Sequence, residues 1–74
     1  MKKYKVYYDY DEEDQKYVAV CPEFFGFILY ESDKKSLFKS IVGALRVYTG
    51  DNSIDARNIE LKEKQIKQEI EINI

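Results

Sequence analysis

Large apolar side chains recur at every second position near the N-terminus. From Lys3 to Tyr10 this alternation, rich in β-branched and aromatic residues, predicts a strand with Tyr7 on the face opposite to the other rings. Five carboxylates among the six residues from Asp9 to Asp14 repel one another and predict a hairpin turn. A second strand follows from Gln15 to Cys21, and Pro22, which has no amide hydrogen to donate to a sheet, closes it.

The middle of the chain predicts a third strand and then a helix. Residues 26–31 are almost continuously apolar, which is typical of a strand covered on both faces, so we expect this strand in the middle of the sheet. Ser32 and Asp33 are helix N-cap residues, and Gly50 suits the left-handed position after a helix. The stripe of the helix between them comprises Leu37, Ile41, Ala44, Leu45 and Tyr48, widened by Phe38 and Val42.

The C-terminal part is harder to assign. Residues 51–55 are typical of a turn, and Ile70, Ile72 and Ile74 alternate as in a terminal strand that could pair with a sheet edge. Isoleucines at helical spacing and helix-favouring Glu, Lys and Gln compete with this pattern, so residues 55–68 stay open between helix and strand.

These elements predict an α+β fold in the order β-β-β-α-β. We expect a three- to four-stranded, mostly antiparallel sheet with one main helix packed on one face. A chain of 74 residues has room for a single domain, residues 1–74. A domain of this size buries only about 60% of its unfolded surface, so association with another chain would add to a thin stability margin.

Composition narrows the class of partner and the compartment. A formal charge of −2 argues against phosphate contacts as the main source of affinity, so we expect no direct nucleic-acid binding. The N-terminus lacks the apolar run of a signal peptide, and no stretch is long enough to span a membrane. With one cysteine, no internal disulfide can form, which favours a cytoplasmic location.

The residues of common active sites are missing from the sequence. The chain has no histidine, which removes the usual general base, metal ligand and nucleophile partner. Cys21 has no cationic neighbour along the chain and reads as a packed side chain. The acidic run from Asp9 to Asp14 lacks the glycine and the terminal glutamate of a calcium loop. We therefore expect a protein that is not an enzyme, with no catalytic residue, metal or cofactor.

The strands predict more apolar surface than one helix can cover, because large side chains fall on both of their faces. An exposed apolar patch usually marks an interface, and tyrosine is enriched in such patches. We expect a homo-oligomer or a partner-binding site, unless the C-terminal segment covers the second face. The predicted contact residues are Tyr7, Phe24, Phe25, Phe27 and Tyr30.

Residues 3–50 resemble the HicB-like antitoxin domain, with residues 51–74 as an extension. The matching features are a strand ending in Pro22-Glu23 with a hydrophobic residue after it, the nearby Gly26, and the helix start at Ser32-Asp33. The remaining ones are the strand sequence Tyr17-Val-Ala-Val-Cys and the helical pair Ala44-Leu45. Two departures are Phe24-Phe25, where the family often has leucine-proline, and Tyr30-Glu31 in place of small or polar residues.

The resemblance implies a partial ribonuclease-H-like fold without catalytic residues. It also implies a function, the neutralisation of a HicA-type mRNA-cleaving toxin by protein-protein occlusion. Nothing after Gly50 resembles the DNA-binding helices that many relatives append, which argues against operator binding. The alternative is a phage or mobile-element inhibitor, or a ligand-binding module, that acts on a host defence system from the same scaffold.

Overall fold

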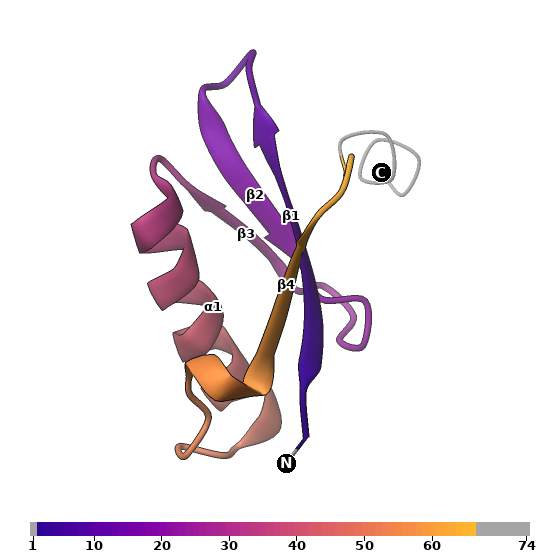
Figure 1. The fold of residues 1–74 in the computed structure, drawn as a ribbon, viewed down its shortest axis with the longest axis vertical. Helices are drawn as coiled ribbons and strands as arrows, with labels where there is room; N and C mark the ends of the chain where they lie inside the picture. The colour runs from indigo at the N-terminus through magenta and orange to yellow at the C-terminus, as the bar shows by residue number, and fades with distance from the viewer. Residues whose placement is uncertain (1, 67–74) are drawn as a thin grey trace.

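In the part of the chain that the structure describes, the sheet has four strands, and one long helix covers one of its faces (Figure 1). The computed structural model describes residues 2–66. Its elements are β1 (Tyr4–Asp11), β2 (Lys16–Val20), β3 (Ile28–Glu31), α1 (Lys34–Thr49), the 3-10 turn η1 (Ala56–Asn58) and β4 (Ile59–Glu63). The strand order is β3-β2-β1-β4, and β1 pairs antiparallel with β2 and parallel with β4. The α+β class and the order β-β-β-α-β are as expected.

The strands of the β1–β2 hairpin extend further than the acidic run predicted, and the turn between them is correspondingly shorter. Asp9 and Asp11 are still in β1, paired with Val18 and Lys16, and the turn occupies residues 12–15. The side chain of Asp11 accepts hydrogen bonds from two turn amides, at 3.0 and 3.4 Å. Carboxylates that bond the turn backbone stabilise the reversal instead of merely repelling one another.

Helix α1 begins and ends where its capping residues predict. The side chain of Asp33 accepts a hydrogen bond of 2.8 Å from the amide of Ser36, and Gly50 adopts a left-handed conformation with φ 70°. Leu37, Ile41 and Leu45 are fully buried on the face that meets the sheet. The amphipathic pattern of the sequence therefore gives the orientation of the helix correctly.

The core lies between α1 and the face of the sheet that it covers. Alternation along the first two strands is confirmed, because Val6 and Ala19 are fully buried there while Tyr7 and Val20 point to the other face. The full core comprises Val6, Ala19, Cys21, Phe27, Leu37, Ile41, Leu45 and Ile54.

One expectation about the sheet is wrong, and one question left open by the sequence is decided. The strand expected in its middle, β3, is an edge strand, and its apolar Ile28 and Tyr30 are 42% and 53% exposed. The fourth strand is β4, inside the range left open between helix and strand, where Ile59 and Leu61 pack on the core. The terminal strand expected at residues 70–74 lies outside the described residues.

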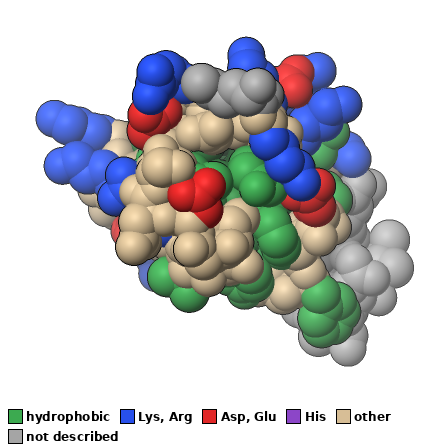
Figure 2. Space-filling model, turned by 90° about the horizontal axis from the view of Figure 1, so that it is seen from below, with side chains coloured by type: hydrophobic (Ala, Val, Ile, Leu, Met, Phe, Trp, Pro, Cys, Tyr) green, Lys and Arg blue, Asp and Glu red, His purple; other side chains and the backbone are tan. Residues whose placement is uncertain are grey.

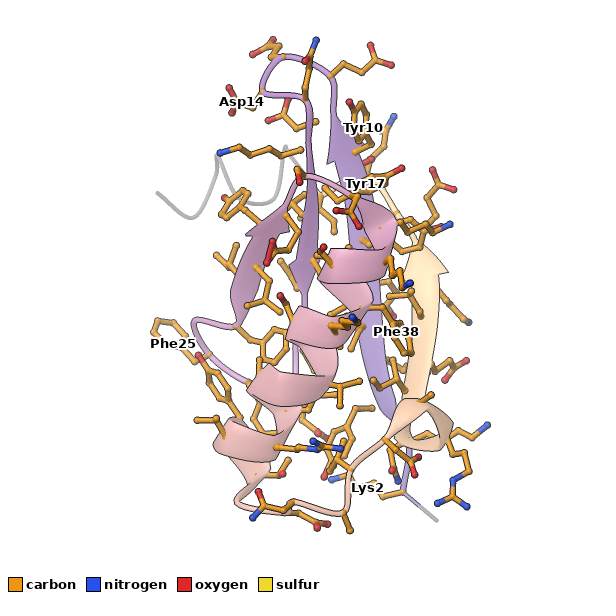
Figure 3. The ribbon with its side chains drawn as sticks, turned by 90° about the vertical axis from the view of Figure 1, so that its left-hand side faces the viewer. Lys2, Tyr10, Asp14, Tyr17, Phe25 and Phe38 are labelled. Carbon is orange, nitrogen blue, oxygen red and sulfur yellow. The ribbon has the colours of Figure 1, made fainter. Side chains whose placement is uncertain are left out.

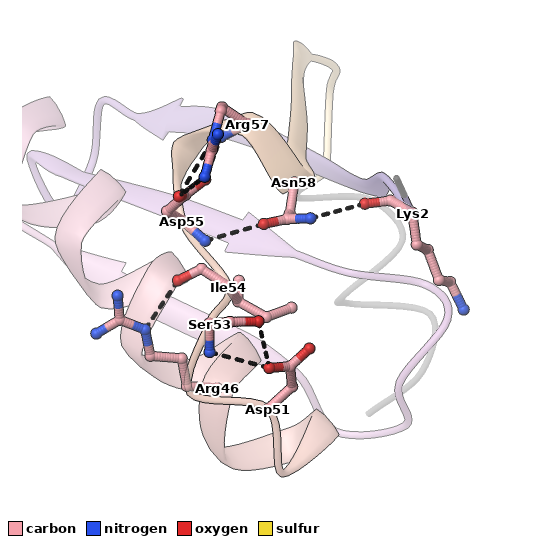
Figure 4. A network of polar contacts seen from close by, with 8 residues as sticks. All are labelled: Lys2, Arg46, Asp51, Ser53, Ile54, Asp55, Arg57 and Asn58. Atoms are coloured by element: carbon pink, nitrogen blue, oxygen red, sulfur yellow. Dashed lines mark hydrogen bonds and ion pairs between the residues drawn. The ribbon is translucent and has the colours of Figure 1, made fainter.

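The connection from α1 to β4 is held by polar contacts (Figure 4). Nε of Arg46 donates to the carbonyl oxygen of Ile54 at 2.9 Å. The amide of Asp55 donates to Oδ1 of Asn58, whose Nδ2 donates to the carbonyl oxygen of Lys2, both at 3.0 Å. This chain of bonds fixes the start of β4 beside the start of β1. Among residues 2–66, no helix combines the length and the apolar character needed to cross a membrane.

Candidate interaction surface

The sheet face turned away from α1, which we call the outer sheet face, carries a row of directly opposite side chains. Ile28 on β3 is opposite Val20 on β2, which is opposite Tyr7 on β1, which is opposite Lys62 on β4. Side chains in such positions have their Cβ atoms about 4.5–5.5 Å apart and contact one another. The row therefore runs across all four strands, apolar on three of them and cationic on the fourth.

A second row lies beside the first, nearer to the hairpin. Tyr30 is opposite Val18, and Val18 is opposite Asp9. Val18 is only 4% exposed, and the carboxylate of Asp9 accepts a hydrogen bond of 3.1 Å from the amide of Ile66, which is also buried. This part of the outer sheet face is well packed, so its accessible apolar surface is concentrated on Ile28 and Tyr30.

Tyr7 is half-buried, and one side of its ring is shielded. Nζ of Lys64 lies 5.1 Å from the centroid of the Tyr7 ring, within the range of a cation–π contact. Lys62, at the end of the first row, forms a 3.5 Å ion pair with Glu60. A partner that binds the outer sheet face would contact tyrosine rings and aliphatic side chains on β1 to β3 and lysine side chains along β4.

The structure does not bring the five predicted contact residues together. Tyr7 and Tyr30 lie on the outer sheet face, as their alternation predicts. Phe27 is only 2% exposed and belongs to the core beneath α1, where half-buried Phe24 packs against it. Phe25 projects from the turn before β3 and is fully exposed (Figure 3). The turn folds under the end of α1, which the sequence pattern of this segment did not indicate.

Phe24 and Phe27 are held in a cluster of rings that also contains Tyr4 and Tyr48. Centroids are 5.2 Å apart between Phe27 and Tyr48, 5.5 Å between Phe24 and Tyr48, and 5.8 Å between Phe24 and Tyr4. Tilted rings at these separations attract one another beyond the effect of their buried area. These ring contacts hold the loop that carries Phe25 against the C-terminal end of α1.

Exposed large apolar side chains occur on α1 as well as on the sheet. Val47 is 80% exposed and Tyr48 is 46% exposed at the end of α1, near the turn that carries Phe25. Seen from below, this end shows apolar side chains between charged ones (Figure 2). With Ile28 and Tyr30 they make five of the six exposed large apolar residues found within positions 2–66, the sixth being Tyr10. Sequence reasoning missed Ile28, because the edge position of β3 cannot be read from periodicity. It also left out Val47, although this residue lies outside the apolar stripe of the helix and is therefore expected to be exposed.

The side chains of common metal sites are not grouped within the described residues. Between residues 2 and 66 there is no group of three His, Cys, Asp or Glu side chains placed to hold a metal ion. Cys21 is buried, and this burial raises the pKa of its thiol, which works against forming the reactive thiolate. In the hairpin, the carboxylate of Asp11 accepts hydrogen bonds from the amides of Glu13 and Asp14.

Comparison of the chain with protein-family models, curated proteins and solved structures finds no significant match in any of the three. The resemblance to HicB-like antitoxins therefore stays a prediction from the sequence.

Proposed function

We propose that the protein is a non-enzymatic inhibitor that binds a small HicA-type RNA-cleaving toxin in the cytoplasm and blocks its catalytic face. The observation that supports this is the apolar row across the outer sheet face, from Ile28 through Val20 to Tyr7. Inhibition by occlusion needs a complementary surface that keeps RNA out and needs no chemistry of its own. Aromatic anchors at the centre of such a surface carry most of the binding energy.

Charge supports the same kind of partner. A protein that cleaves RNA presents basic groups to phosphate, and this chain carries a net charge of −2 with exposed carboxylates at Glu12, Glu13 and Asp14 on the hairpin. The hairpin extends beyond α1 at one end of the sheet (Figure 3). Acidic side chains at the rim of an interface accelerate association and select against acidic partners.

The test is binding to a purified HicA-type toxin, with Tyr7→Ala and Tyr30→Ala as the interface variants. Each should raise Kd by about tenfold to a hundredfold, the range of an aromatic contact residue. Tyr10→Ala is the matched control, because Tyr10 is 41% exposed but lies on the opposite face of β1. The proposal fails if the wild-type protein neither binds the toxin nor protects RNA from it. It also fails if both interface variants bind as tightly as wild type.

A second candidate function is inhibition of a host defence protein by a phage or mobile-element protein of this fold. The observation that favours it is Phe25, which is fully exposed on a turn held by the ring cluster. A rigid, projecting ring is suited to insertion into a pocket of a partner. Phe25→Asp should then abolish suppression of the defence system in a phage-plating assay and leave toxin neutralisation intact. Suppression retained by this variant would rule out the ring as the anchor.

A further inference from the structure

We propose that two copies of the chain join through the edge of β3, giving one continuous eight-stranded sheet with both helices on the same face. The outer edge of β3 is unpaired within residues 2–66. Natural sheets usually protect such an edge by a charged residue, proline, a bulge or a covering segment, or by keeping the strand short, as the four residues of β3 are. Ile28, Leu29 and Tyr30 provide none of the first three, whereas β4, at the opposite edge, carries Glu60, Lys62 and Glu63.

The sequence of β3 is complementary to itself. In an antiparallel pair, residues that lie opposite each other point to the same face of the sheet, whereas neighbours along one strand point to opposite faces. A two-fold axis that relates two β3 strands must therefore pass through a pair of identical residues and not between two residues. When the two-fold axis passes at Leu29, Ile28 of each copy lies opposite Tyr30 of the other copy, so this pair occurs two times on the outer sheet face. Leu29 then meets its own counterpart on the helix face. No like charges are opposed, because Glu31 falls opposite Phe27 and is held by the hydroxyl of Ser40 at 2.8 Å.

The strand alone is too small for a stable dimer. A typical interface buries about 800 Å² on each partner, which is roughly 15% of the 5290 Å² surface of this chain. Four strand residues extend only about 13 Å. The flank of α1 above β3 must therefore take part. The bond from Ser40 to Glu31 shows which flank this is, and Ser36, Gly43 and Val47 share it at helical spacing.

The packing within one chain does not explain why residue 43 is a glycine. A glycine inside a helix costs stability relative to alanine, and nothing lies within 4 Å of the position where its Cβ would be. Internal packing therefore does not require glycine. In the proposed dimer, Leu29 lies two residues before Glu31, about 6.6 Å along the strand. That distance corresponds to about four residues of helix beyond Ser40, close to Ala44. Gly43 is the residue of this flank nearest to that level, so it lies near the two-fold axis of the proposed dimer, where the two helices come closest.

The first test measures the mass of the isolated protein by light scattering at about 100 μM, which populates even a weak interface. We expect twice the 8.8 kDa of one chain. Ile28→Lys should raise Kd for the dimer by about a hundredfold or more, since it acts twice in a symmetric contact. Tyr10→Lys, at a site with 41% exposure against 42% for Ile28, should leave the mass unchanged. A wild-type monomer, or a dimer that survives Ile28→Lys, overturns the proposal.

A second test uses variants whose folding should improve. Gly43→Ala and Gly43→Gln both add helix propensity at a site with free space, but only the larger side chain keeps the helices apart. We expect a folded monomer for Gly43→Gln and a dimer weakened far less for Gly43→Ala. The double variant Ile28→Cys/Tyr30→Cys should form a disulfide-linked dimer on oxidation. A dimer that tolerates Gly43→Gln and does not cross-link would place the interface elsewhere and refute the proposal.

The inference is independent of the proposed toxin partner, because both tests use the protein alone. If both hold, the outer sheet faces of the two copies adjoin across β3, and Ile28 and Tyr30 of each copy form the centre of one larger docking surface.

Discussion

Packing of α1 on the sheet can be measured by comparing two positions on the same helix. Leu45 is fully buried against the sheet, and Val47, two residues later, is 80% exposed. Removing a buried leucine side chain loses its transfer free energy and leaves a cavity, at a cost of about 3–4 kcal/mol. A domain of this size has a total stability of roughly 4–11 kcal/mol. Leu45→Ala should therefore remove a large part of the free energy of unfolding.

Val47→Ala should behave differently. The side chain is in contact mainly with solvent, and alanine is the better helix former, so the change should lie within about 0.5 kcal/mol of wild type. Leu45→Met, which conserves volume, should cost less than about 1.5 kcal/mol.

Urea denaturation followed by circular dichroism, at protein concentrations low enough to keep the chain monomeric, measures all three variants. With a slope near 1 kcal/mol per molar urea for a small domain, Leu45→Ala should lower the midpoint by about 3 M. A loss below about 1 kcal/mol for Leu45→Ala would refute the described packing. So would equal losses for Leu45→Ala and Val47→Ala.

Three further predictions concern caps and the buried thiol. Asp33→Ala should lower the melting temperature by a few degrees, and Asp33→Asn should retain most of the cap. Hydrogen bonds from Ser36 lower the pKa of the Asp33 carboxyl, so its contribution is present above the unfolded value, near 4, and is lost as the pH falls through the lower folded pKa. The difference between wild type and Asp33→Ala should close in acid, and a constant difference would contradict this origin. Gly50→Ala should cost about 1–2 kcal/mol, because alanine is strained at φ 70°, and an unchanged urea midpoint would exclude that strain. Cys21 should react slowly with a disulfide reagent at neutral pH and rapidly in denaturant, since burial raises its pKa; rapid reaction of the folded protein would show an accessible thiol.

Local chemistry made the helix and the hairpin strands predictable. The capping residues Asp33 and Gly50 act through the backbone within a few residues, so their roles can be read without knowledge of the tertiary fold. The faces of β1 and β2 also follow from alternation alone, because a strand has a fixed period of two. These features were correct since no distant residue decides them.

Strand order and ring placement depend on contacts that the sequence does not encode locally. An apolar run such as residues 28–30 predicts burial on both faces, but the sheet leaves Ile28 and Tyr30 exposed at its edge. Phe25 and Phe27 are alike in sequence pattern and opposite in exposure, because the turn before β3 passes beneath the end of α1. The parallel strand β4 was left undecided because its charged residues favour a helix, and only pairing with β1 decides its structure.

The parallel pairing of β1 with β4 has a consequence for synthesis. The first strand made, β1, has one neighbour at hand in β2, but its other neighbour begins only at Ile59. A nascent or truncated chain that stops before this residue exposes the backbone hydrogen-bonding groups of a central, aromatic-rich strand. Chains that end before Ile59 should therefore be prone to aggregation, and the ribosome must release β4 before the sheet can be completed.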